Sequence, residues 1–319
     1  MPKLIKLRES VLKYLVAAVL LAVPLYPKFP IISIPGTFVA IRLEDFLMVA
    51  IAIVLAAFVL SDIGSFFKDK INKAILLFLV AGLFSVASAV LITKTVTAHI
   101  AFLHWVRRIE YFIPFFLGVY ALKSGRKNLE FYIKVLMVTI LISFVYGFGQ
   151  KNFSWPIITT QNQEYSQGVA LRYVPGAHIN AGFAGHYDLG TFLVLLLPLF
   201  IALFFLARNN LVRFSYLIII SAALWLLAFS GSRISTVSFL TAASLSLILV
   251  RRYKAIPLVI LFSLIFFSLS PNLVARYSRI FEVVRGRLIE MKGTFSEPTS
   301  RLYSIKYVYA QVDSNGTPQ

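Results

Sequence analysis

The sequence predicts an all-α membrane protein, a polytopic helical bundle of about nine transmembrane helices with two long outer loops. Of its 319 residues, 59% are hydrophobic and only 14% are charged, and the mean hydropathy is +0.83. Soluble domains carry about 25% charged residues, so this composition excludes an ordinary soluble fold. Apolar stretches long enough to cross a bilayer recur along the chain. No soluble domain is evident, and residues 1–319 are therefore treated as a single membrane domain.

Nine stretches are long and apolar enough to be expected as spans. They are 10–27, 44–61, 74–93, 99–122, 131–150, 188–207, 212–230, 234–250 and 255–275. The first is the weakest, because Pro24 and Pro27 break its end. The stretch 234–250 is rich in Ser, Thr and Ala, which let helices approach closely, so we expect it inside the bundle.

Lys and Arg residues set the expected orientation. They gather at the N-terminus and in every second connection: Lys3, Lys6, Arg8, Lys68, Lys70, Lys73, Lys123, Arg126, Lys127, Arg208, Arg213, Arg251, Arg252 and Lys254. Basic connections stay on the cytoplasmic side, so the N-terminus is predicted to be cytoplasmic. The long loops, about 151–187 and 276–319, then lie outside. Within the second loop, 273–291 has a helical period that predicts an amphipathic interfacial helix, with Leu273 and Tyr277 on its apolar face and Arg276 elsewhere.

The net charge and the cysteine content limit the partners and the kinds of site that the protein can have. The net charge of +18 would suggest nucleic acid for a soluble protein. Here the basic residues alternate with apolar runs, so membrane lipids and lipid-linked phosphates are the expected partners, and no nucleic acid is expected. The chain has no cysteine, which excludes disulfides and thiolate metal sites. The basic N-terminus lacks a small-residue cleavage site and further spans follow it, so we do not interpret it as a signal peptide.

The span 99–122 contains an unusual charged group, Arg107, Arg108 and Glu110. An arginine at the centre of a bilayer costs about 2.5–3.5 kcal/mol on insertion scales. Such residues therefore indicate a ligand cavity or a buried partner. An internal ion pair that fixes helix packing is the alternative, although Glu110 cannot pair well with both arginines from its own helix. Both interpretations stay open at this stage.

A second polar group lies in the first outer loop. Arg172 carries a guanidinium fork suited to phosphate, and His178, Asn180, His186 and Asp188 follow it among glycines that permit close backbone approach. The two histidines are the only strong ligand types there, so no metal site is expected. A polar turn that leads into the next span is the alternative.

Two further arginines stand where helices are expected to begin. Arg233, in FSGSRIST, could combine with the first backbone N–H groups of its helix to bind an anion. The alternative is a cap by Ser232 with Arg233 reaching to the membrane interface. Arg301 follows Ser300, a candidate helix cap, and an ordinary solvated arginine is the alternative there.

Taken together, the arginine sites fall on the expected outer side and suggest a phosphate or diphosphate ligand delivered from the membrane. The sequence has no P-loop, HExxH or GxSxG motif, so ATP-driven chemistry and metal hydrolysis are not supported.

Four segments in order, spanning about 75–311, resemble the O-antigen ligase and O-antigen polymerase superfamily. They are FLHWVRRIEYFIPFF, LRYVPGAHINAGFAGHYDLGTFLVLLLPLF, AFSGSRIST and SRLYSIKYVYAQV. The resemblance implies a lipid-linked glycan transferase (glycosyltransferase) of the cytoplasmic (inner) membrane, a multi-pass cell-envelope protein of lipopolysaccharide and other polysaccharide biosynthesis. It would pass a glycan from undecaprenyl diphosphate to a glycan or lipid acceptor on the outer face, without a cofactor or a metal.

The resemblance also assigns residues. Arg172 and Arg233 would contact the diphosphate, and Arg301 is a weaker candidate. In the family, an outer-loop histidine is thought to help activate the acceptor, within a continuation of the block that begins here at Ser300. This sequence has no match to that histidine, so the catalytic residue is unassigned, and the chain is expected to be a truncated member.

Two other functions remain in view. A flippase or transporter of lipid-linked glycans would also need intramembrane arginines, yet transporters tend to show related halves with interrupted helices, and no such symmetry is visible. An inactive fragment or membrane scaffold is the other alternative, and it would not need Arg107 and Arg108 within a span. The sequence does not separate ligase from polymerase.

Overall fold

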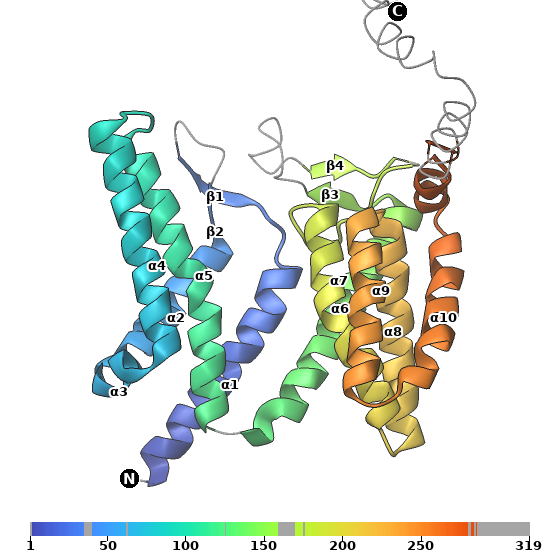
Figure 1. Cartoon of the computed structure of the whole chain (residues 1–319), viewed down its shortest axis with the longest axis horizontal. Helices are drawn as coiled ribbons and strands as arrows, with labels where there is room; N and C mark the ends of the chain where they lie inside the picture. Colours follow the sequence, from blue (N-terminus) through green and yellow to red (C-terminus); the bar gives the residue numbers. More distant parts are fainter. Residues whose placement is uncertain are drawn as a thin grey trace, which may run out of the picture.

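The computed structural model describes residues 2–34, 40–61, 63–124, 126–158, 170–174, 176–279, 282, 283 and 285. The fold is all-α, as the sequence predicts, with ten labelled α-helices and a further short helix, Pro271–Arg279, in the described residues (Figure 1). The labelled helices are α1 (Pro2–Leu25), α2 (Leu43–Ser61), α3 (Ile63–Lys68), α4 (Lys70–Ala87), α5 (Ala98–Ser124), α6 (Leu129–Phe153), α7 (His186–Leu206), α8 (Asn210–Ser230), α9 (Arg233–Leu249) and α10 (Ile256–Ser268). A π-helical turn, η1 (Ser88–Ile92), extends α4, and 3₁₀ turns precede α6 (η2, Arg126–Asn128) and α10 (η4, Tyr253–Ala255).

Two short antiparallel hairpins lie at the end of the protein opposite the N-terminus (Figure 1). Strand β1 (Pro30–Ser33) pairs with β2 (Ala40–Arg42), and β3 (Pro156–Ile158) pairs with β4 (Ala170–Arg172). The connections α2–α4, α5–α6, α7–α8 and α9–α10, which carry the clustered Lys and Arg, lie at the N-terminal end (Figure 1). The basic connections therefore share one end of the protein and the hairpins the other.

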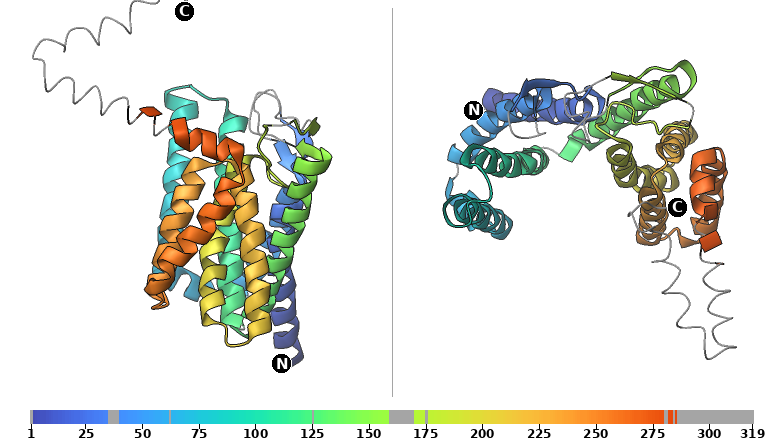
Figure 2. Two further views of the ribbon diagram at one scale, coloured as in Figure 1. Left: turned by 90° about the vertical axis from the view of Figure 1, so that its right-hand side faces the viewer. Right: turned by 90° about the horizontal axis from the view of Figure 1, so that it is seen from above.

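The helices form two groups, each with its own buried core (Figure 2). The first core joins α1, α2 and α5 through Leu12, Ile51 and Leu117. The second, larger core joins α6 to α10 and includes Leu197, Phe200 and other side chains of α7 and α8. Helix α1 links the groups because it contacts both α5 and α6.

Within the described residues, five helices are long and apolar enough to cross a membrane, and a bent pair brings the number to six. The five run over Leu43–Leu60, Lys70–Ile92, Leu129–Phe153, His186–Leu206 and Asn210–Ser230. The expected nine spans are therefore not confirmed, although a multi-pass membrane protein is. Helix α5 contains Arg107, Arg108 and Glu110 at its middle, α1 is charged over its first half, and α9 is only 17 residues long.

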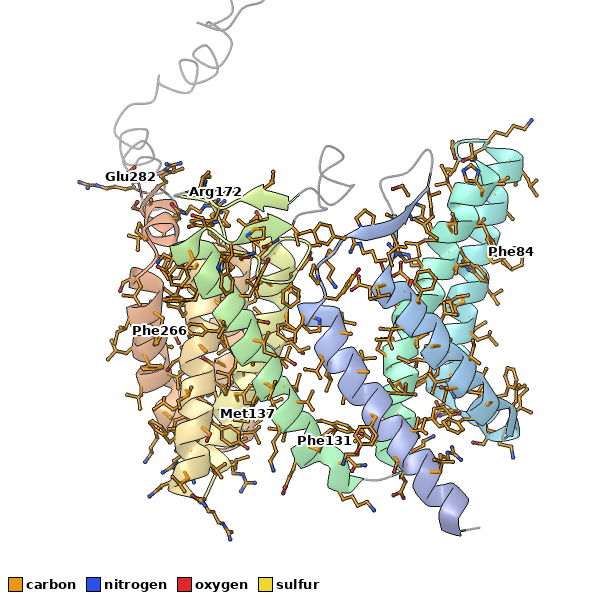
Figure 3. All side chains as sticks on the ribbon, turned by 180° about the vertical axis from the view of Figure 1, so that it is seen from behind. Phe84, Phe131, Met137, Arg172, Phe266 and Glu282 are labelled. Carbon is orange, nitrogen blue, oxygen red and sulfur yellow. The ribbon has the colours of Figure 1, made fainter. Side chains whose placement is uncertain are left out.

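The exposure of apolar side chains fits a lipid-facing surface. None of the side chains of α4, all of them described, is buried, and Phe84 is 71% exposed and projects away from the helices (Figure 3). Lipid tails, like a protein core, accept such side chains without cost. Helix α9 was expected inside the bundle, and one face of it does pack closely on α7, where a Cβ on Gly190 would lie 2.6 Å from Ser235 Oγ.

The predicted ninth span, 255–275, is wrong as a single straight helix. Helix α10 ends at Ser268, and the next helix, Pro271–Arg279, is bent away from it by 105°. Pro271 explains the break, because proline has no N–H for the helix ladder and restricts the residue before it. The amphipathic helix expected over 273–291 is helical from Pro271 to Arg279; Arg301 and most residues after 279 lie outside the described residues.

Candidate functional site

A cluster of histidine and arginine side chains lies at the hairpin end of the second helix group. Arg276 donates from Nη2 to Nε2 of His178 at 2.6 Å and from Nη1 to the carbonyl oxygen of Gly231 at 3.2 Å. A guanidinium group can only donate, so Nε2 of His178 is the acceptor and its ring proton lies on Nδ1. The sequence pattern had placed Arg276 away from the apolar face of its helix. The structure instead half-buries it against the loop that precedes α7.

The two histidines of the loop face each other. The ring centroids of His178 and His186 are 4.7 Å apart, and the ring of Tyr187 lies 4.0 Å from that of His186. Nδ1 of His178 and Nε2 of His186 are buried and have no hydrogen-bond partner among the described residues. Buried polar atoms are nearly always satisfied by hydrogen bonds, so these two nitrogens are candidates for contact with a small polar group.

The protonation state of His178 follows from its surroundings. Burial, the positive charge of Arg276 and the neighbouring His186 lower the pKa of His178 to about 4. The imidazole is therefore neutral near pH 7. A group that removes or screens the charge of Arg276 would raise this pKa.

The α8–α9 junction is shaped to receive the His178 ring. Gly231 has φ = +65°, and a Cβ there would lie 2.5 Å from Nδ1 of His178. Only glycine combines this backbone conformation with such a close approach. Ser232 then caps α9 by accepting from the backbone N–H of Ser235, which is the alternative that the sequence left open. Arg233 is exposed on the first turn of α9, and Tyr277 donates to its carbonyl oxygen at 3.2 Å.

Asn180 has a structural role. Its side chain accepts from Gln150 at 3.0 Å and donates to the carbonyl oxygens of Ile158 and Phe183, both at 2.8 Å. Gln150 in turn accepts from the backbone N–H groups of Asn180 and Ala181. These bonds use the polar atoms of Asn180, which is 2% exposed. Asn180 therefore fixes the loop that presents His178.

The other loop candidates are spread around this cluster. Arg172 is exposed on β4, opposite Pro156, at the same end of the protein (Figure 3). Asp188 is exposed on the first turn of α7, where its charge acts on both His186 and Lys28. Within the described residues, Arg172, Arg233 and Arg276 form no ion pair with a carboxylate. That Arg172 and Arg233 share one diphosphate site stays a prediction.

The arginines of α5 lie in a different environment, in the first helix group. Arg107 Nη2 lies 3.0 Å from Asp45 Oδ2, and its Nε lies 3.7 Å from Glu110 Oε2. Arg107 also lines a cavity of about 420 Å³. Arg108 is exposed, with its guanidinium 5.8 Å from the ring of Tyr111. Both open interpretations thus describe Arg107: it is ion-paired and it faces a cavity.

Sequence reasoning named Glu110 but missed Asp45, the closer partner of Arg107. Glu44 and Asp45 open α2 directly after β2, and acids at the start of an apolar span were a visible signal. Lys28, 5% exposed, contacts Glu44 and donates to the carbonyl oxygen of Val23 at 2.6 Å. Asp45 also accepts from the backbone N–H of Arg42 at 2.8 Å.

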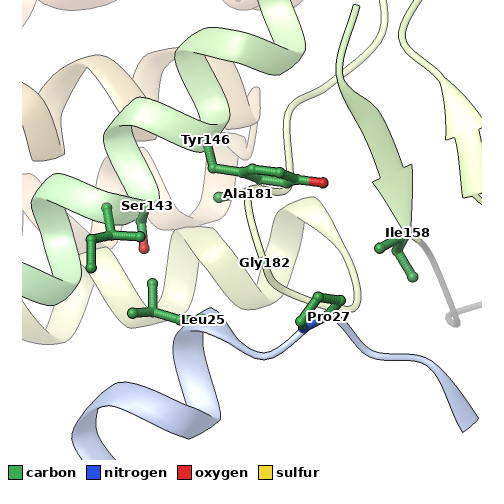
Figure 4. Close-up of a pocket in the computed structure, with 8 residues that line it drawn as sticks. Leu25, Pro27, Ser143, Tyr146, Ile158, Ala181 and Gly182 are labelled. Atoms are coloured by element: carbon green, nitrogen blue, oxygen red, sulfur yellow. The ribbon is translucent and has the colours of Figure 1, made fainter.

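The two helix groups meet where the end of α1 contacts α6 and the loop before α7. This contact region, called the seam below, lies between the His178 cluster and the Arg107 cluster. The loop residue Gly182 lies against the end of α1, where a Cβ would be 2.7 Å from the carbonyl oxygen of Pro24. A small cavity of about 90 Å³ lies in this seam, between Leu25 and Pro27 on one side and Ser143 and Tyr146 on the other (Figure 4). The loop that contains His178 therefore touches both helix groups.

A scan against protein-family models, a search of curated proteins and a search of solved structures each found no match to this chain. In the described part of the chain, no group of three or more His, Asp or Glu side chains is placed to hold a metal ion.

Proposed function

We propose that the protein transfers a glycan from undecaprenyl diphosphate to a glycan or lipid acceptor at the outer face of the cytoplasmic membrane, by the chemistry of the O-antigen ligases and polymerases that its sequence resembles. One observation carries this proposal. At the hairpin end of the second helix group, Arg276 has no carboxylate partner among the described residues, and it contacts a histidine pair in which two ring nitrogens have no hydrogen-bond partner.

The two arginine clusters differ in their ion pairs with carboxylates. A diphosphate is strongly anionic, and carboxylates around an arginine would compete with it and repel it. Arg107 has Asp45 and Glu110 beside it, whereas Arg233 and Arg276 have no ion-pair partner among the described residues. The second cluster is therefore the better site for the diphosphate.

The reaction needs a stabilised leaving group and a proton acceptor. The acceptor hydroxyl oxygen attacks the anomeric carbon, the bond from that carbon to the diphosphate oxygen breaks, and its electron pair leaves with the diphosphate. Guanidinium groups stabilise the charge that develops there, because they stay protonated and bind phosphate oxygens bidentately. The hydroxyl proton goes to the histidine pair, which acts as the general base.

Arg276 couples donor binding to this proton transfer. In the structure its guanidinium occupies Nε2 of His178 and helps to lower the pKa of that imidazole. A diphosphate bound to Arg276 would compete for the N–H donors and offset the positive charge. His178 would then become more basic only when the donor is bound.

The topology belongs to the same proposal. With the basic connections in the cytoplasm, the N-terminus is cytoplasmic and His178 faces the outside, where lipid-linked glycans are assembled into surface polymers. A flippase for such lipids is the second candidate, and the 105° break after α10 favours it, because transporters use interrupted helices at their binding sites.

Binding of undecaprenyl diphosphate to the purified protein in nanodiscs tests the site. We expect the double variant Arg233→Ala/Arg276→Ala to bind it at least about tenfold more weakly, since each charge-assisted hydrogen bond contributes about 1.5–3 kcal/mol. Arg279→Ala is the matched control, because Arg279 is exposed on the same helix as Arg276. Unchanged affinity in the double variant, with Arg279→Ala equally unaffected, would refute the diphosphate site.

A glycan-loaded donor separates the two candidate functions. Transfer releases free undecaprenyl diphosphate and a glycosylated acceptor, whereas a flippase moves the intact donor across a vesicle bilayer. Transbilayer movement without release would replace the transferase proposal with the transporter.

A further inference from the structure

We infer that the cavity between α1, α2 and α5 binds the headgroup of a phospholipid with a primary ammonium group, such as phosphatidylethanolamine. This site is separate from the histidine cluster and does not depend on the proposed transfer reaction. It is the 420 Å³ cavity that Arg107 lines.

The cavity has the two-part lining that an amphiphile requires. Val19 and Val23 of α1, Met48 of α2 and Pro114 of α5 form an apolar wall. The polar part comes from the start of α2 and the middle of α5, and it includes both arginine and carboxylate side chains. Helices α1 and α2 touch each other much less than either touches α5, so the space lies between them. Acyl chains fit the apolar wall while a headgroup meets the charged one.

The carboxylates of the cavity are unequally neutralised. Glu44 has Lys28 and Arg42 as partners, and Asp45 has the guanidinium of Arg107 at 3.0 Å. Among the described residues, the one cation paired with Glu110 is Arg107, at a long distance of 3.7 Å, and the carboxyl group of Glu110 lies beside that of Asp45. Two neighbouring carboxylates repel each other, and a cation placed between them relieves that repulsion. Glu110 is therefore the place for an ammonium group.

The same cavity offers a partner for phosphate. Arg107 uses Nη2 on Asp45 and turns Nε toward Glu110. A guanidinium group has five N–H donors, so others remain for a phosphate oxygen. A headgroup that carries phosphate and ammonium together would satisfy both signs of charge at once.

Other occupants fit the cavity less well. A diphosphate has no cationic group of its own, so it would bring further negative charge next to Glu44, Asp45 and Glu110. The quaternary ammonium of phosphatidylcholine has no N–H to donate to Glu110, and phosphatidylglycerol has no cation. A primary ammonium gains charge-assisted hydrogen bonds, which are about twice as strong as neutral ones.

Thermal unfolding of the delipidated protein tests the lipid class. We would add phosphatidylethanolamine, phosphatidylcholine or phosphatidylglycerol with identical acyl chains. Only phosphatidylethanolamine is expected to raise the unfolding temperature, by about 3 °C or more at saturation. Equal stabilisation by all three lipids, or the largest effect from phosphatidylglycerol, would overturn the inference. This test uses the unmodified protein, so it does not depend on whether a variant folds.

A charge-neutral variant tests the residue. We expect Glu110→Gln, which keeps the size of the side chain, to weaken phosphatidylethanolamine binding about tenfold in native mass spectrometry. Glu282→Gln is the control, because Glu282 is exposed elsewhere (Figure 3). Full retention of lipid selectivity in Glu110→Gln would contradict the assignment. Affinity for undecaprenyl diphosphate should stay unchanged in this variant, so this test and that of the transferase site can fail separately.

Discussion

Arg276 and His178, 98 residues apart in the sequence, are joined by a hydrogen bond of 2.6 Å. The bond ties the helix that follows the 105° bend to the loop that precedes α7. It also leaves a neutral imidazole under the direct influence of a permanent cation. Both consequences can be measured.

Stability should fall in acid because of His178. Its pKa is about 4 in the folded protein, whereas an unfolded histidine titrates near 6.5. Between these values the unfolded chain binds a proton that the folded protein does not, so stability is highest above pH 6.5 and declines toward pH 4. We expect the unfolding temperature of His178→Gln to depend less steeply on pH across this window. Parallel curves for the two proteins would mean that His178 does not carry this pH dependence.

Gly231→Ala should disturb the histidine cluster. The new Cβ would lie 2.5 Å from Nδ1 of His178, at a φ of +65° that alanine rarely adopts. We expect a loss of about 1–3 kcal/mol of stability together with loss of transfer activity. Gly118→Ala is the control, since a Cβ there meets no atom within 4 Å. Equal stability of the two variants would show that the loop relaxes away from the junction.

The two neighbouring arginines of α5 should respond oppositely to leucine. Arg107→Leu removes the counter-charge of Asp45 and Glu110, and we expect a destabilisation of at least about 2 kcal/mol. Arg108→Leu removes an exposed charge, and it should be tolerated because the insertion cost of the helix falls. Unfolding in detergent and the fraction of inserted protein measure both effects. The reverse order would mean that Arg108 has the buried partners.

Gln150→Leu should loosen the loop that holds His178. The substitution removes the partner of the buried Asn180 amide and of two backbone N–H groups. Unsatisfied buried groups cost about 1–3 kcal/mol each. In a double-mutant cycle with Asn180→Ala, we expect strong coupling, because both side chains belong to one network. Simple additivity would contradict that network.

The absence of cysteine makes the orientation simple to test. Val174→Cys, at a position 60% exposed near the hairpin end, should react with a membrane-impermeant maleimide added outside intact cells. Lys254→Cys, in an exposed basic connection, should react only after permeabilisation. The opposite result would place His178 in the cytoplasm and rule out transfer at the outer face.

Much of the fold was accessible from the sequence, because long apolar stretches and basic connections reflect the cost of polar groups in lipid. The cap at Ser232 was also predictable, since it depends only on neighbouring residues. Pro271 lies within the last apolar stretch and could have indicated the bend. Hydropathy alone predicted one continuous span over 255–275.

The site was less accessible. The contact of Arg276 with His178 depends on that bend, and a straight helix would have turned Arg276 to solvent. The neutralisation of Arg107 depends on Asp45, 62 residues away. The acid at the start of α2 is visible in the sequence, but its pairing with Arg107 is not. Asn180 was found as a polar loop residue, but its role in the Gln150 network required the three-dimensional arrangement.

The two buried cores draw on separate stretches of the chain, one between Leu12 and Ala121 and the other between Ile140 and Leu273. Proteins are made from the N-terminus, and compact units fold as they emerge. The first helix group can thus close its core while the ribosome is still translating α6 to α10. The loop that contains Gly182 and His178 then packs on the end of α1 after the first helix group has folded. The histidine cluster is therefore among the last parts of the molecule to assemble.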